Sequence, residues 1–148
     1  MRWFEDFNVG DVFEIGPVSP SEEEIVEFAS QYDPQPFHLD AEAAKDSLFG
    51  GLVASGWHTV ALFMGMFVRE VLNDSASLGS PGVDELRWLA PVRPGDTLRG
   101  RSTVLETRPS SKDPRRGTVF TQNEVLNQDG VVVMTLKARG FFARRTGV

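Results

Sequence analysis

The segment from Leu52 to Leu72 is apolar on almost every side when it is placed on a helix. One helical stripe collects Trp57, Val60, Ala61, Met64, Phe67, Val68 and Val71, and Leu62, Phe63 and Met66 cover much of the remainder. A helix that is hydrophobic all round is buried in a core or spans a membrane. His58, Arg69 and Glu70 interrupt the run and leave fewer clean apolar residues than the roughly 20 that a bilayer needs. The segment therefore predicts a buried central helix.

The second half of the chain has the pattern of strands separated by turns. Residues 83–89, 97–107, 118–126 and 131–142 are strand-like, and Val12 to Ile15 predicts a shorter strand near the N-terminus. Residues 127–130 are typical of a hairpin turn. Because no helical segment separates the later strands, we expect consecutive strands to pair antiparallel. About five strands and one long helix predict an α+β fold, a single domain over residues 1–148 with the sheet curled around the helix.

Two shorter helices are expected before the apolar segment. Ser21 can cap the first, and three glutamates follow it at the positive end of the helix dipole. Apolar residues then recur at helical spacing up to Tyr32, so this helix leads directly into Asp33. Asp40 can cap a second helix that runs to Lys45.

The composition excludes several classes of site. The chain has no cysteine, which removes disulfides, thiolate nucleophiles and cysteine metal clusters and fits a reducing compartment. Residues 1–6 lack the basic start and apolar run of a secretory signal, so we expect a cytoplasmic protein. An exposed sheet edge and face would favour a homodimer, or a larger homo-oligomer built from dimers.

The net charge of −6 is unevenly distributed. Residues 1–74 carry 3 basic and 14 acidic side chains, whereas residues 75–148 carry 12 and 7. The overall acidity argues against a nucleic-acid partner, which needs a net basic face. The arginine-rich second half could hold a small polyanionic ligand, or its charges could be ordinary solvated ones.

Asp33 and His38 lie five positions apart across Pro34 and Pro36, where the prolines interrupt helical structure. An acid beside an imidazole can act as a general acid/base pair, because histidine titrates near neutral pH and a partly buried aspartate can be tuned toward it. The alternative is structural, with Asp33 ending a helix and His38 hydrogen-bonded in the core.

Ser55 and Gly56 stand at the expected start of the long helix. Ser55 can cap that helix, and the backbone N–H groups that follow lack intrahelical acceptors, so they could hold an oxyanion. Glycine at position 56 would let a ligand carbonyl approach closely. It could equally serve close packing of the helix on the sheet.

These segments together resemble a known family. Phe28-Ala29, Tyr32 to Asp40 and Gly51 to Gly56 closely resemble the MaoC-like dehydratases, the (R)-specific enoyl-CoA hydratase group with the hot-dog fold. The motif of that family reads approximately Asp-x-Asn-Pro-aliphatic-His, followed by a glycine at the start of the central helix. Residues 86–98, Leu-Arg-Trp-Leu-Ala-Pro-Val-Arg-Pro-Gly-Asp-Thr-Leu, are similar to its strand and Pro-Val-x-x-Gly-Asp turn.

The resemblance implies reversible addition of water to a 2-enoyl thioester, giving a 3-hydroxyacyl thioester in fatty acid metabolism. Asp33 and His38 would activate the water, and the Gly56 N–H would bind the thioester oxygen. No metal or redox cofactor is required, and coenzyme A enters as part of the substrate. Residues expected to contact the acyl-CoA are Gln35, Phe37, Ser55, Trp57, Met64, Arg87 and Arg93, with the Lys112–Arg116 group as a further candidate for the phosphates.

Two positions depart from the family pattern. Gln35 stands where asparagine is usual, so its amide lies one methylene further out. Met64 stands where some members carry a serine facing the acyl pocket, and its bulky thioether predicts a shorter or differently shaped cavity, or simply core packing.

Two alternatives to a hydro-lyase stay open. A hot-dog thioesterase would need a carboxylate from the central helix, where only Glu70 is available, near the far end. The Gln35 change also leaves room for a non-catalytic acyl-CoA-binding subunit.

Overall fold

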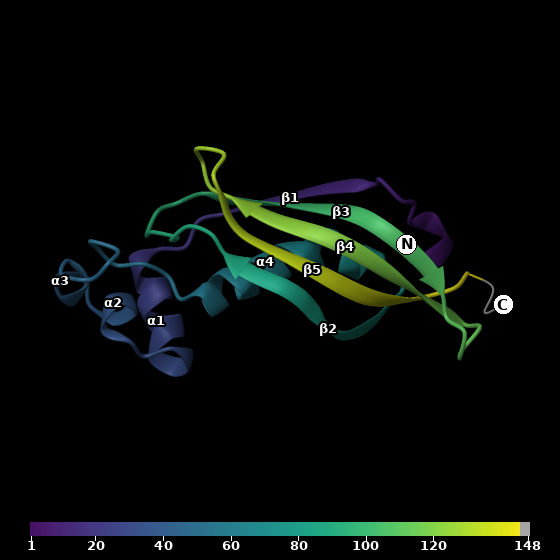
Figure 1. The fold of residues 1–148 in the computed structure, drawn as a ribbon, viewed down its shortest axis with the longest axis horizontal. Helices are drawn as coiled ribbons and strands as arrows, with labels where there is room; N and C mark the ends of the chain where they lie inside the picture. The colour runs from purple at the N-terminus through teal and green to yellow at the C-terminus, as the bar shows by residue number, and fades with distance from the viewer. Residues whose placement is uncertain (146–148) are drawn as a thin grey trace.

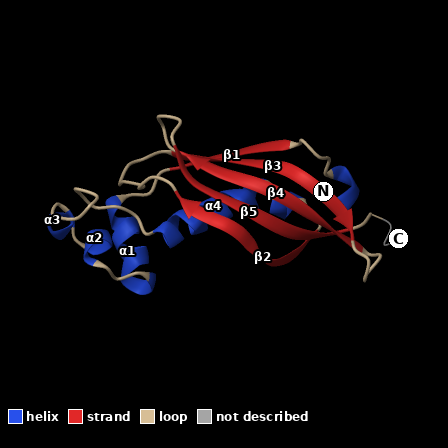
Figure 2. Ribbon diagram, in the orientation of Figure 1, coloured by secondary structure: helices blue, strands red, loops and turns tan. Residues whose placement is uncertain are grey.

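The computed structural model describes residues 1–145 and places the long apolar segment against one face of an antiparallel sheet (Figure 1). The helices are α1 (Glu22–Tyr32), α2 (Pro36–Leu39), α3 (Ala41–Ala44) and α4 (Gly56–Glu70), with 3-10 turns η1 (Phe4–Asp6) and η2 (Leu72–Asp74). The strands are β1 (Val12–Val18), β2 (Ser77–Trp88), β3 (Leu98–Pro109), β4 (Arg116–Leu126) and β5 (Val132–Ala143). Figure 2 shows that α1 to α3 gather at one end of the sheet. The predicted sheet around a central helix is confirmed.

The strand order is β1-β3-β4-β5-β2, and every neighbouring pair is antiparallel. The expectation that consecutive strands pair is right for β3 with β4 and β4 with β5, but wrong for β2 and β3. The connection of residues 89–97 contains two prolines and is too long for a tight hairpin, and β2 instead pairs with β5 at the opposite edge. The two edges of the sheet are therefore β1 and β2.

Two strands extend furthest beyond their predicted bounds. β2 begins at Ser77 rather than Val83, and β1 continues past Ile15 to Val18. Glycine and proline in both extensions lower the local strand propensity. Pairing with a neighbouring strand holds these residues extended, with register shifts on the way.

The inner face of the sheet follows from strict alternation of buried and exposed residues along β4 and the first half of β3. The buried positions are Leu98, Gly100, Ser102 and Val104 on β3, and Gly117, Val119, Thr121, Asn123 and Val125 on β4. The residues between them are at least partly exposed. Three of the inward positions are polar, although this face packs against an apolar helix.

Helix α4 begins at Gly56, as the expected cap at Ser55 predicts, and residues 52–55 lead into it as irregular chain. The expected burial on all sides is wrong for the single chain, since the sheet covers only one side of the helix. Phe63 and Met66 are 5% and 1% exposed, whereas Trp57 and Met64, on the less covered side of the helix, are 56% and 48% exposed. No helix within residues 1–145 has the length and hydropathy to cross a membrane.

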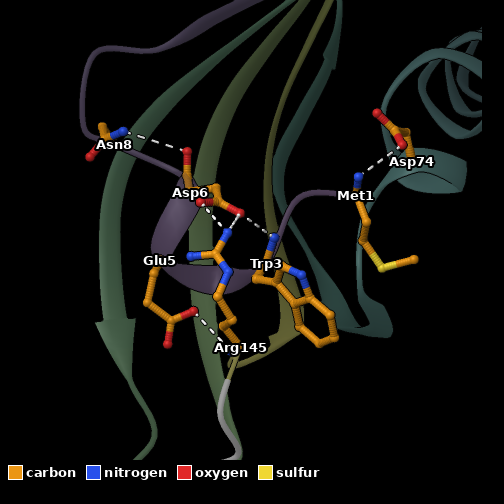
Figure 3. A network of polar contacts seen from close by, with 7 residues as sticks. All are labelled: Met1, Trp3, Glu5, Asp6, Asn8, Asp74 and Arg145. Atoms are coloured by element: carbon orange, nitrogen blue, oxygen red, sulfur yellow. Dashed lines mark hydrogen bonds and ion pairs between the residues drawn. The ribbon is translucent and has the colours of Figure 1, made fainter.

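The N-terminal residues meet Arg144 and Arg145, the last residues that the structure describes, at the end of the sheet opposite α1 to α3 (Figures 1 and 3). The Arg145 guanidinium pairs with Asp6 in η1, and Asp6 also accepts a hydrogen bond of 2.9 Å from the Trp3 backbone N–H. The hydrogen bond from Arg145 holds the pKa of the Asp6 carboxyl below its usual range. These contacts close a second, smaller core formed by Phe4, Phe7, Val104, Val119 and Phe142.

Candidate active site

The turn after α1 places Asp33 and His38 through a short helix that the sequence did not reveal. Ser21 caps α1 as predicted, and Asp33 ends that helix with its N–H bonded to the Ala29 carbonyl. Helical structure stops at Asp33, as the prolines predict, but it resumes within the turn, because residues 36–39 form α2. Proline is tolerated at the first helical position, where its missing N–H would have no partner, so Pro36 starts a helix here. Asp40 then caps α3, as predicted.

The acid and the imidazole face one another. Asp33 Oδ2 lies 3.3 Å from His38 Nε2, and the two side chains are 18% and 7% exposed. The other ring nitrogen, Nδ1, lies 2.6 Å from the Val53 carbonyl oxygen. Because a carbonyl can only accept, Nδ1 carries a proton, and Nε2 is the ring nitrogen that faces Asp33. The turn therefore brings together two side chains whose separation their spacing in the sequence does not fix.

Two hydrogen bonds hold the Asp33 carboxylate. The Gln35 side-chain amide donates to Oδ1 at 2.7 Å, and the Ser55 hydroxyl donates to Oδ2 at 2.8 Å. Burial opposes the charge on Asp33, but these two donors and the nearby His38 outweigh it and lower the pKa of Asp33 below its usual range. The carboxylate is therefore ionised at neutral pH and can accept a proton.

The start of α4 is joined directly to this pair. Ser55 is fully buried, and its hydroxyl both donates to Asp33 and accepts from the Trp57 N–H at 3.2 Å, which confirms the predicted cap. The Gly56 N–H donates no hydrogen bond to any of residues 1–145. It stands at the positive end of a 15-residue helix, where an anion is favoured.

His38 and Gly56 line a common cavity of about 380 Å³. Phe37 and Phe49 form part of its wall, and Trp88 from β2 contributes another part. The Trp88 indole donates to the Gly56 carbonyl at 2.9 Å, and a Cβ at position 56 would lie only 2.3 Å from Trp88 Cε2. Glycine is needed here for close packing against the indole, and its N–H remains available.

The other residues expected to contact substrate are more dispersed. Trp57 is exposed and packs edge-on against Trp88, with ring centroids 5.2 Å apart. Met64 lines a different cavity, further along α4. Arg93 donates to the Phe49 carbonyl at 2.7 Å, which places it beside the cavity wall, whereas Arg87 is exposed on β2.

The Lys112–Arg116 group lies at the β3–β4 turn, at the end of the molecule opposite α1 to α3 (Figure 1). Arg115 is already bonded to Asp113 at 2.9 Å. The structure therefore separates this group from the acid and imidazole.

Nine residues of the cavity wall at His38 and Gly56 were not among the predicted site residues: Phe49, Val53, Ala54, Thr59, Trp88, Leu89, Ala90, Pro91 and Val92. Trp88 lies inside the segment that carries the family resemblance, but no spacing rule relates it to Gly56, 32 positions earlier. Its contact depends on where β2 lies in the sheet. Thr59 lies one turn into α4 from Ser55, and helical periodicity could have placed it near the site.

Other ionisable groups lie away from the acid and imidazole. His58 is buried in a stack on Phe28, and burial lowers its pKa. Glu70 is the last residue of α4, about 20 Å along the helix from Gly56, and it accepts a hydrogen bond from the Gly16 N–H. Within residues 1–145, no three His, Asp or Glu side chains are grouped to hold a metal ion.

An antiparallel sheet that holds one long helix, with an acid and an imidazole at the N-terminus of that helix, defines a hot-dog domain. A family model described as "MaoC like domain" matches residues 7–127. The chain therefore belongs to the MaoC-like domain family, which includes dehydratases and hydratases.

Solved and curated relatives agree with this assignment. A MaoC-like dehydratase from Rhodospirillum rubrum is 46% identical and superposes with a TM-score of 0.90 over 97% of each chain. R-hydratase PhaJ1 from Pseudomonas aeruginosa is 29% identical, with a TM-score of 0.76 over 96% of this chain and 85% of that one. Mesaconyl-CoA hydratase of Cereibacter sphaeroides is 32% identical over 139 residues. The match covers 90% of this chain and 39% of that protein, so the chain spans well under half of the length of that relative.

Proposed function

We propose that this chain is a hydro-lyase that adds water reversibly to a 2-enoyl-CoA, giving a 3-hydroxyacyl-CoA. The observation that carries the proposal is the arrangement of three groups: the ionised Asp33, the Nε2 of His38 at 3.3 Å from it, and the free N–H of Gly56 next to Ser55. Family membership supports the same reaction class. Coenzyme A enters only as part of the substrate, and the chemistry requires no other cofactor.

Each group has a role in this reaction. Water loses a proton to the Asp33–His38 pair while its oxygen bonds to the β-carbon, and the electrons of the double bond move toward the thioester oxygen. The Gly56 N–H and the helix dipole stabilise that developing negative charge. The pair then returns a proton to the α-carbon, which completes the hydration. We treat the pair as one unit, because closely coupled groups titrate together.

Removing either member of the pair tests the proposal. Asp33→Asn and His38→Ala should each lower kcat/KM for hydration of 2-enoyl-CoA by at least about a hundredfold while the fold is retained. The loss of absorbance of the conjugated thioester measures turnover, and circular dichroism measures folding. Asp46→Asn, which alters an exposed aspartate outside the site, is the matched control.

Three results would contradict this function. An unchanged kcat/KM for hydration in both variants would show that Asp33 and His38 have no catalytic role. Release of free thiol without a 3-hydroxyacyl product would indicate a thioesterase. Saturable acyl-CoA binding with no turnover across a panel of chain lengths would indicate a binding subunit.

We further propose that the chain assembles as a homodimer through the open face of α4 and the β2 edge. Large apolar side chains are exposed there: Trp57, Met64, Leu78, Val83, Trp88 and Leu89 are each between 45% and 56% exposed. Trp57 and Trp88 also contact each other, and large exposed apolar side chains that gather in this way mark an interaction site. A second copy presenting the same surface would cover the side of the helix that the sheet leaves open.

A further inference from the structure

A second cavity, of about 260 Å³, lies between α4 and the inner face of the sheet. Val60, Phe63, Met64 and Phe67 supply its helical wall. Its sheet wall includes the polar side chains of Ser77, Ser80, Ser102, Thr121, Asn123 and Arg139, of which Ser102, Thr121 and Asn123 are buried. The reaction proposed above uses none of these three.

The three polar residues form one patch at the centre of the sheet. Ser102 on β3 lies directly opposite Asn123 on β4, and Asn123 in turn lies opposite Leu136 on β5. Thr121 is two residues from Asn123 on the same strand and therefore faces the same side. Ser102, Asn123 and Thr121 are 0%, 1% and 8% exposed.

The patch has hydrogen-bonding capacity that the protein does not use. The Asn123 amide nitrogen donates to Thr121 Oγ1 at 2.9 Å and to the Leu136 carbonyl at 3.4 Å. Because that carbonyl can only accept, these contacts fix the amide orientation and leave Oδ1 as a free acceptor. Asn123 Oδ1 and Ser102 Oγ have no hydrogen-bond partner among the described residues. Leaving a buried polar group unpaired is unfavourable, so this patch requires an explanation.

The cavity begins close to the proposed reaction centre. Val60 follows Gly56 by four residues, about 6 Å along the helix, and Phe67 lies about 10 Å further on. A thioester held at Gly56 could thus direct its acyl chain along α4 and over the patch. Asn123 Oδ1 and Ser102 Oγ are both buried from solvent in the structure. Met64 lines the same cavity, and its flexible unbranched side chain can move to admit a ligand.

We propose that this cavity selects acyl chains that carry a hydroxyl group beyond the reacting carbons. Asn123 Oδ1 accepts a hydrogen bond from that hydroxyl, and the Ser102 hydroxyl donates a hydrogen bond to its oxygen. The apolar wall contacts the rest of the acyl chain. The inference rests on the proposed function, because it takes the acyl chain to start at Gly56. An acyl chain without the hydroxyl would leave Asn123 Oδ1 and Ser102 Oγ without hydrogen bonds. The free-energy cost of these unpaired oxygens would make the cavity discriminate against that chain.

The test compares 2-octenoyl-CoA with the set of its monohydroxylated derivatives, the hydroxyl being moved along the chain beyond the double bond. Wild type should favour at least one derivative by about tenfold or more in kcat/KM. Asn123→Leu, which keeps the side-chain size, and Ser102→Ala should each abolish most of that preference. Ser75→Ala is the matched control, since Ser75 is buried outside the cavity and bonds to the Val71 carbonyl.

A binding measurement separates this inference from the proposed reaction. Titration calorimetry compares octanoyl-CoA with its hydroxylated derivatives, none of which needs to be hydrated. Tighter binding of a hydroxylated chain that Ser102→Ala or Asn123→Leu removes supports the inference even if wild type hydrates nothing. Equal affinity for all chains in wild type overturns it and assigns the patch to internal water or to structure. Thermal unfolding checks each variant, and the smaller Ser102→Ala change keeps the test valid if Asn123→Leu does not fold.

Discussion

At the scale of single residues, the site depends on how its carboxylate is held. Asp33 is bonded by Gln35 on one oxygen and by Ser55 on the other, while His38 faces it with a tautomer fixed by the Val53 carbonyl. The presence of glutamine rather than asparagine at position 35 therefore has a physical explanation. The longer amide of Gln35 reaches back to Asp33 from the start of α2, and it lowers the pKa of that carboxyl.

Replacing that donor should change the pH dependence. In Gln35→Leu the pKa of Asp33 rises toward its ordinary value, so the carboxylate protonates at a higher pH and the acid limb of the kcat/KM profile shifts upward. The same shift affects stability. Because folding lowers this pKa, Asp33 stabilises the native state above its unfolded pKa, and this contribution disappears as the pH falls through the folded value. Acid unfolding of Gln35→Leu should therefore begin at a higher pH.

Gln31→Leu is the matched control, because Gln31 is exposed on α1 and does not contact Asp33. Profiles of Gln35→Leu and wild type that coincide would show that the amide does not tune the acid.

At the scale of elements, α4 joins the site to the core. Its first residue, Gly56, meets Trp88 of β2, and its buried side packs on the sheet. The same helix contains a second glycine, Gly65, which faces only the flexible end of Arg69. The two glycines therefore experience different constraints within one helix.

Substituting each glycine separately by alanine should have opposite effects on the free energy of unfolding. A Cβ at position 56 would lie 2.3 Å from the rigid Trp88 ring, so Gly56→Ala should lose about 1–3 kcal/mol of stability and most of its turnover. At position 65 the added Cβ meets Arg69 Nη1 at 3.0 Å, which can move, so Gly65→Ala should be neutral or stabilising by up to about 1 kcal/mol. Chemical denaturation measures both free energies of unfolding. Equal stability of the two variants would contradict the close packing of Gly56 on Trp88. Combining Trp88→Leu with Gly56→Ala should restore part of the lost stability.

At the scale of the whole molecule, one sheet covers only one side of a helix that is apolar on nearly all sides. The uncovered side adjoins β2, an edge strand with its own exposed apolar residues. The same surface also borders the site, because Trp57 and Trp88 contact each other there. Assembly and the shape of the site are therefore coupled in the dimer that we propose.

A charge on the open face of α4 should prevent that assembly. Ala61 is exposed in the middle of this face, and glutamate is a good helix former, so Ala61→Glu should convert the dimer to a monomer without unfolding the helix. Sedimentation velocity measures the mass, and Gln31→Glu on exposed α1 is the control. A wild-type chain that is monomeric at micromolar concentration, or a variant that remains dimeric, would rule out this interface.

The sequence by itself determined the features that depend on local chemistry. Capping serines and aspartates fixed the starts of α1, α3 and α4, alternation revealed the central strands, and the proline-rich turn identified Asp33 and His38. Only the tertiary structure decided the contacts that join distant segments. Pairing of β2 with β5 brought Trp88 onto Gly56, and the register of β3 on β4 put Ser102 opposite Asn123. The reason is physical: caps and periodicity act over a few residues, whereas strand order and packing depend on how the whole chain covers its one long helix.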